Sequence, residues 1–231
     1  MKRFWTEVTV ETADGGFAIR LDNRPLRTPS KAPCLLPTRA LAEAVAAEWA
    51  AQETEVNPDA MPLTRAANTA IDRVIPEHDV VAAIVAAFGE TDLICYRAPH
   101  PEGLVQCQAQ AWDPLVAWAT QALGAPMVVV SGVMHLSQPP GSLAKLDAAV
   151  RVHGPWEMTA LHDLVSISGS LVIGLAVSHG HLDPATAWSL SRIDETWQID
   201  QWGEDTEAAA VAGRRCANLA SSARLLELVR S

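Results

Sequence analysis

The hydrophobic period changes near residue 37, and this change constrains the possible fold more than any other feature of the sequence. Before it, apolar residues alternate with polar ones. Phe17, Ile19 and Leu21 fall on one side of an extended chain, with Arg20 on the other. After it, in residues 37–52, apolar residues recur every three or four positions, as on one face of a helix. We therefore expect an α+β fold, with a small N-terminal antiparallel β domain followed by a larger, mainly α-helical domain.

Turn signals divide the first part further. The "ADGG" of residues 13–16 and the Asp22–Asn23 pair are typical of hairpin turns, and "CLLP" can add a short strand. Pro58 and Pro62 then interrupt the helical pattern. We place a boundary there, so that residues 1–60 form a small β-rich domain with one following helix and residues 61–231 form a helical domain.

Composition excludes several classes of protein. The chain is 49% hydrophobic and 19% charged, with a formal charge of −10. This charge argues against nucleic acid and against an anionic membrane surface as partners, and it is compatible with a basic patch on a partner protein. The longest uncharged apolar stretch, Leu164–Ser178, is too short to span a bilayer and contains four serines, so we predict a buried helix and no stable membrane insertion.

The four cysteines are scattered without a CxxC pair, which favours reduced thiols over a disulfide framework or a metal site. The N-terminal stretch has no apolar core of the signal-peptide type. We expect a bacterial cytoplasmic location, or the mitochondrial matrix if a presequence has been removed.

Few residues suit catalysis. His179 and His181 are two apart, so on a helix they point in different directions and do not suggest a metal site. His162 and Asp163 are neighbours, and we expect Asp163 not to orient the His162 ring. Phosphate-loop, dinucleotide-binding, nucleophile-elbow and zinc-protease motifs do not occur. A small hydrolase or transferase whose site is built from distant His, Asp and Ser residues stays open as an alternative.

One stretch, "RIDETWQIDQW", combines carboxylates with tryptophans. On a single helix from Pro184 to Trp202, one face would collect Trp188, Arg192, Glu195 and Trp202. Glu195 then has two interpretations. It can form a surface ion pair with Arg192, worth a few tenths of a kcal/mol, or it can wait in a partly apolar face for a donor on a partner protein.

Seven segments occur in an order and spacing that resemble a known family. They are "RFW", "LDNRPLRTP", "ALAEAVAAEWAAQ", "MPLTRAANTAID", "DLICYR", "WDPLVAWA" and "SRIDETWQIDQWG". Together they resemble the assembly chaperones of the catalytic head of the F-type ATP synthase, in the family that binds the α subunit. The resemblance runs from about Arg3 to Gly203, nearly the whole chain.

The resemblance implies a chaperone that binds the free α subunit, without enzyme activity and without a cofactor. Trp49 matches a tryptophan whose loss is damaging in the family, and Glu195 matches an acidic position needed for function rather than for folding. We expect Glu195, Trp202, Trp188 and Arg192 to bind the partner, and Trp49 and Asp72 to be structural or partner-binding. The other motif residues, expected to be mainly structural, are Asp92, Arg97, Trp112 and Asp113. A scaffold protein in another complex would share these features and differ only in its partner.

Overall fold

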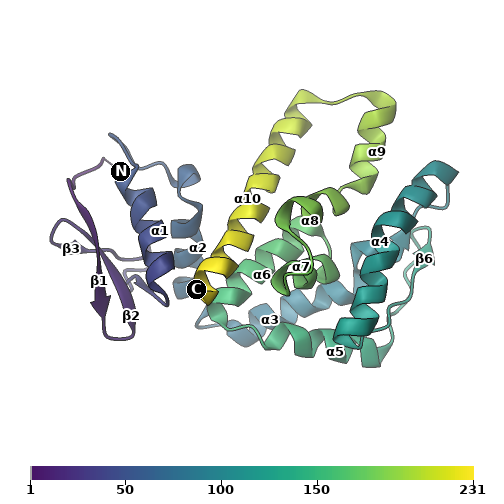
Figure 1. The fold of residues 1–231 in the computed structure, drawn as a ribbon, viewed down its shortest axis with the longest axis horizontal. Coiled ribbons are helices and arrows are strands. Elements are labelled where there is room, and N and C mark those ends of the chain that lie inside the picture. The colour runs from purple at the N-terminus through teal and green to yellow at the C-terminus, as the bar shows by residue number, and fades with distance from the viewer. Residues whose placement is uncertain (1) are drawn as a thin grey trace. The chain divides into compact units, whose positions relative to one another are not determined.

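The structure is a computed structural model that describes residues 2–231. The chain forms a short sheet followed by many helices, as Figure 1 shows, which confirms the expected α+β class. Its contacts define two compact units. Of the described residues, the first contains 2–78, Gly154–Ala160 and Ser221–Ser231, and the second contains Asp79–His153 and Leu161–Ala220. The division into independent domains at residue 60 stays a prediction.

The first unit contains the small antiparallel sheet. Its strands are β1 (Val8–Ala13), β2 (Gly16–Leu21), β3 (Arg24–Pro25) and β4 (Leu35–Leu36), and β2 pairs with each of the other three. Both predicted turns and the short strand in "CLLP" are confirmed. Gly16 is needed for close packing, because a Cβ there would lie 2.4 Å from the carbonyl oxygen of Leu36.

Helix α1 (Arg39–Ala50) covers the sheet and supplies much of the core of this unit. Thr38 caps it by accepting a hydrogen bond from the Leu41 N–H at 3.2 Å. Leu41 and Val45 are fully buried, as is Ile19 of β2. The Glu48 carboxylate accepts hydrogen bonds from the first N–H groups of the next helix, α2, and so joins the two helices.

The remaining elements of the first part are a 3-10 turn at Pro58–Ala60, α2 (Pro62–Thr69) and a π-helical turn at Ala70–Val74. The helices in or extending into the second unit are α3 (His78–Ala87), α4 (Glu102–Leu123), α5 (Pro140–Arg151), α6 (Pro155–Ser168), α7 (Leu171–Ser178), α8 (Pro184–Leu190), α9 (Ile193–Trp202) and α10 (Thr206–Arg230). A short parallel pair, β5 (Tyr96–Arg97) and β6 (Val130–Ser131), lies between helices in sequence.

The apolar stretch 164–178 is largely buried, as predicted, with Ser166 exposed, but it is not one helix. The chain breaks between α6 and α7 at Gly169, whose φ of +72° is left-handed, and Ser170 then caps α7 by accepting from the Ile173 N–H at 3.0 Å. All eight residues of α7 are buried. Among residues 2–231, no helix is both long and apolar enough to cross a membrane.

Candidate functional site

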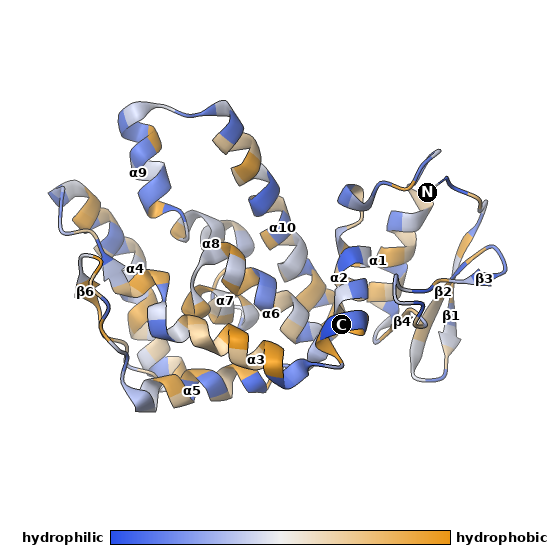
Figure 2. Ribbon diagram, turned by 180° about the vertical axis from the view of Figure 1, so that it is seen from behind, coloured by the Kyte–Doolittle hydropathy of each residue, from blue (hydrophilic) through white to orange (hydrophobic). Residues whose placement is uncertain are grey.

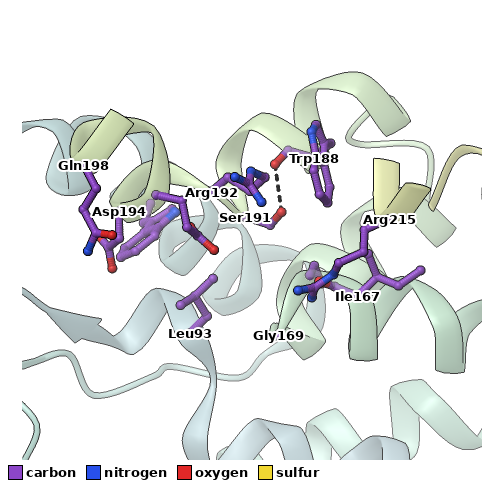
Figure 3. A pocket seen from close by; sticks show the side chains of 12 residues that line it. Leu93, Ile167, Gly169, Trp188, Ser191, Arg192, Asp194, Gln198 and Arg215 are labelled. Atoms are coloured by element: carbon purple, nitrogen blue, oxygen red, sulfur yellow. Dashed lines mark hydrogen bonds between the residues drawn. The ribbon is translucent and has the colours of Figure 1, made fainter. Parts of the chain in front are cut away.

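The segment 184–202 forms two helices, so the predicted single helix is wrong. α8 ends at Leu190 and α9 begins at Ile193, because Arg192 has a non-helical backbone with φ −128° and ψ 25°. The Ser191 hydroxyl donates a hydrogen bond to the Trp188 carbonyl at the end of α8, as Figure 3 shows. The break places Asp194 and Glu195 in the first turn of α9, where the helix dipole favours negative charge.

Helix α4 holds the beginning of α9 in place. The indole N–H of the buried Trp112 donates to the Leu190 carbonyl at 2.8 Å, and the Gln108 amide donates to the Asp194 carboxylate. Further along, the Trp197 ring lies against Gly103, where an added Cβ would come within 2.6 Å of the ring. Asp194 therefore has a structural partner on α4.

A pocket of about 330 Å³ opens beside this junction. Its walls come from α4, α6, α8, α9 and α10 together with the turns beside them, and they mix aromatic, aliphatic and charged side chains (Figure 3). The lining residues are Leu93, Trp112, Ile167, Ser168, Gly169, Trp188, Ser191, Arg192, Asp194, Glu195, Gln198 and Arg215.

Glu195 lies at this pocket without an ion-pair partner. The residue is exposed, and within residues 2–231 it makes no hydrogen bond or ion pair. Of the two interpretations of Glu195, the surface ion pair with Arg192 is therefore wrong. The Arg192 guanidinium instead stacks over the Trp188 ring, with its Cζ 5.0 Å from the ring centroid.

The structure brings together three of the four residues expected to bind a partner. Trp188, Arg192 and Glu195 all line the pocket. Trp202 does not line it, and its side chain at the end of α9 is 80% exposed. Contact of these residues with a partner stays a prediction.

Trp49 and Asp72 belong to the first unit. Trp49 is only 9% exposed and packs edge-on against Trp5, with ring centroids 5.2 Å apart. Asp72 accepts hydrogen bonds from the Thr28 hydroxyl at 2.7 Å and from the Ser30 N–H at 3.2 Å, and the Thr28 bond is the main reason that its pKa is lowered. Both residues thus make contacts within the fold, and their part in partner binding stays a prediction.

The remaining motif residues also make structural contacts. Asp92 is fully buried and accepts hydrogen bonds from the N–H groups of Ile94 and Val172, at the beginning of α7. Burial raises the pKa of Asp92 to about 6. Arg97 pairs with Asp113 at 2.9 Å and lies over the Trp112 ring.

The residues considered for catalysis are not assembled into a site at this pocket, whose lining contains no histidine. The expectation that Asp163 cannot orient His162 is wrong, since the His162 Nδ1 lies 3.1 Å from the Asp163 carboxylate, a hydrogen bond that raises the pKa of His162. A second contact, 2.6 Å between His153 and Ser178, was not foreseen, but both side chains are only 3% exposed. Among the described residues, no group of three or more His, Cys, Asp or Glu could hold a metal ion.

Sequence reasoning missed Arg215 on α10 and the walls of the pocket at Leu93 and Ile167. These residues are far from Glu195 in sequence and share no motif with it. The Arg214–Arg215 pair is visible in the sequence, but helical periodicity alone does not indicate which of the two arginines faces a pocket.

The tryptophan and arginine side chains at this exposed pocket are residue types that are enriched in protein–protein interfaces. Comparison with known families agrees. Residues 2–120, more than half of the chain, match the family described as "ATP12 chaperone protein". The chain therefore belongs to the ATP12 family of chaperones, and the resemblance to an assembly chaperone of the ATP synthase is confirmed at the level of the family.

Similar proteins occur in bacteria and in yeast mitochondria. The crystal structure of Atp12 from Paracoccus denitrificans is 50% identical, covers 99% of this chain and 98% of that one, and superposes with a TM-score of 0.96. A crystal structure from Agrobacterium tumefaciens is 42% identical, with 98% and 85% coverage and a TM-score of 0.94. The mitochondrial protein atp12 of Schizosaccharomyces pombe is 25% identical over 97% of this chain and 81% of its own length.

Proposed function

We propose that this chaperone binds the free α subunit of the F-type ATP synthase and shields the subunit interface of α until the β subunit replaces it. The observation that carries the proposal is the exposed, unpaired carboxylate of Glu195 at a pocket walled by Trp188 and Trp112. The family resemblance implies that an acidic residue at this position is needed for function, which supports the proposal.

The physical reason for such a chaperone lies in its client, the free α subunit. A free subunit of a ring exposes apolar surface that is meant for its neighbour, and such surface aggregates. A chaperone that acts without nucleotide needs an apolar patch matched in shape and a few polar groups that fix the register. Its affinity must be modest, so that the β subunit displaces it by mass action.

The acidic charge around α9 supports the proposal that the surface of the α subunit that binds there is basic. Residues 193–207 contain six acidic side chains and no lysine or arginine. They comprise α9, the turn after it and the beginning of α10 (Figure 1). The six are Asp194, Glu195, Asp200, Glu204, Asp205 and Glu207. Such a segment attracts a basic partner and disfavours an acidic one.

We also propose that the protein works without catalytic turnover and without a cofactor. Its family is named for chaperones. Two Ser–His contacts occur among residues 2–231, and neither favours the hydrolase or transferase alternative: the 2.6 Å contact between His153 and Ser178 is buried, and the 3.4 Å contact between His135 and Ser137 joins exposed side chains only two residues apart. We place it in the bacterial cytoplasm because two of the similar solved structures come from bacteria, with the mitochondrial matrix as the alternative suggested by the yeast relative.

The test is reconstitution with purified subunits. Light scattering of the free α subunit is expected to fall when this chain is added in equal amount, and added β subunit is expected to release the chain from α. Serum albumin at the same concentration serves as the control. Aggregation of α that is unchanged by the chain, together with no co-purification of the two proteins, would refute the proposal.

A further inference from the structure

Two arginines at the Glu195 pocket are held in place by neutral groups rather than by carboxylates. Arg192 lies over the Trp188 ring, and Arg215 of α10 donates a hydrogen bond to the Ile167 carbonyl at 2.8 Å. Within residues 2–231, neither guanidinium forms an ion pair. Both guanidinium groups are therefore fixed in position without a carboxylate at ion-pair distance.

These arginines and Glu195 mark the region where two pockets adjoin. Arg192, Glu195 and Arg215 line the pocket described above, and the same three residues line a second pocket between α9 and α10. Figure 3 shows Arg192 and Arg215 entering the first pocket from different elements of the fold. A chain with a net charge of −10 thus presents at one place two arginines that form no ion pair within the described residues, although Asp194, Glu195, Asp205 and Glu207 also line these pockets.

A guanidinium group offers five donors in a planar fork, and its best partner is a planar acceptor such as a carboxylate. Arg215 uses one donor on Ile167, so the others stay available. A phosphate fits less well, because Asp194 and Glu195 line the first pocket and Asp205 and Glu207 line the second, and their repulsion is stronger for a doubly charged group than for a single carboxylate. The electrostatics therefore favour a single carboxylate beside a cationic group that meets Glu195.

We propose that Arg192 and Arg215 form a receptor for an acidic side chain of the client, next to the position where Glu195 receives a basic one. The inference rests on the proposed function, because the client is the α subunit. It adds Arg215, on a different helix, to the binding site. It also adds a requirement for a client segment that carries an acidic and a basic side chain close together.

The neighbouring residue Arg214 provides a matched control. It is exposed on the same helix and lines neither of the two pockets. Arg215→Glu and Arg214→Glu make the same change in net charge, so any difference between them reports the pocket rather than the overall field of the protein.

The experiment measures the affinity of the full-length chain for purified α subunit by calorimetry or surface plasmon resonance. Arg215→Glu is expected to weaken binding by roughly tenfold or more, and Arg214→Glu by about threefold or less. Arg215→Lys keeps the positive charge but loses the planar arrangement of donors. Its affinity is expected to lie between those of wild type and Arg215→Glu. Thermal unfolding of each variant shows that the fold is intact.

Three results would overturn the inference. One is equal weakening by Arg215→Glu and Arg214→Glu, and another is wild-type affinity in both Arg215 variants. The third is stronger competition by inorganic phosphate than by acetate at equal ionic strength, which would replace the carboxylate with a phosphate. If the wild-type chain does not bind α at all, the proposed function fails; if it binds and Arg215→Glu binds equally well, only this inference fails.

Discussion

Helices α7 and α9 belong to the same compact unit and differ completely in burial. All eight residues of α7 are buried, whereas α9 has no buried residue, and much of its ribbon is hydrophilic in Figure 2. α7 is capped at its beginning by Ser170 and by the buried Asp92. α9 instead carries acidic residues and an exposed tryptophan. The first helix serves stability, and we propose that the second presents side chains to a partner.

The largest difference between the two helices is expected in truncations of apolar side chains. Leu175 of α7 is fully buried, so Leu175→Ala should lower the free energy of unfolding by about 2–5 kcal/mol. Ile199 of α9 is only partly buried, and Ile199→Ala should cost about 1 kcal/mol or less. Urea unfolding of both variants measures this, and equal losses would remove the distinction between the helices.

The contribution of Asp92, at the beginning of α7, to the free energy of unfolding should depend on pH. Its folded pKa of about 6 lies above the ordinary value of 3.8, because burial disfavours the charged form. The folded state therefore binds the proton more tightly, and the resulting stabilisation is complete below pH 3.8 and is lost as the pH rises through 6. The difference in unfolding free energy between wild type and Asp92→Asn should fall by about 3 kcal/mol between pH 3.5 and pH 7. A difference that is independent of pH would show that Asp92 does not titrate in this way.

The adjacent carboxylates Asp194 and Glu195 of α9 should differ in their contribution to the free energy of unfolding. Asp194→Ala should cost about 1–3 kcal/mol of unfolding free energy, because it leaves the buried Gln108 amide without its acceptor. Glu195→Ala should cost about 1 kcal/mol or less, since only its interaction with the helix dipole is lost. Urea titrations compare the two directly. A Glu195 variant as destabilised as the Asp194 variant would argue for a structural role of Glu195.

The smallest effect on stability is expected at the end of α9. Trp202 is 80% exposed, so Trp202→Ala should change the unfolding free energy by no more than about 0.5 kcal/mol while weakening capture of the α subunit. Thermal melts and pull-down with purified α measure the two effects separately. Normal capture by this variant would remove Trp202 from the predicted interface.

Local patterns were sufficient to predict the N-terminal hairpin and the helix that follows it. Alternation of apolar residues and the "ADGG" turn predict the β1–β2 hairpin, and Thr38 before an apolar stripe predicts α1. These signals are short in range, so the sequence alone carries them. The break at Gly169 also had a signal, a glycine followed by a capping serine within an apolar stretch.

The site was less predictable for two physical reasons. The break between α8 and α9 falls at Ser191–Arg192, where neither proline nor glycine marks it. Packing against Trp112, Gln108 and Gly103 of α4 accompanies this break, and such contacts depend on the tertiary fold. Arg215 is brought to Glu195 by the course of α10, which periodicity does not determine.

The central claim is that Glu195 acts on a partner and not on its own fold. The most direct measurement is the dissociation constant for purified α subunit of wild type and of Glu195→Lys, with circular dichroism and thermal melts on both. We predict a loss of affinity of roughly a hundredfold or more with an unchanged melting curve. A folded Glu195→Lys variant that binds α as tightly as wild type would contradict the claim.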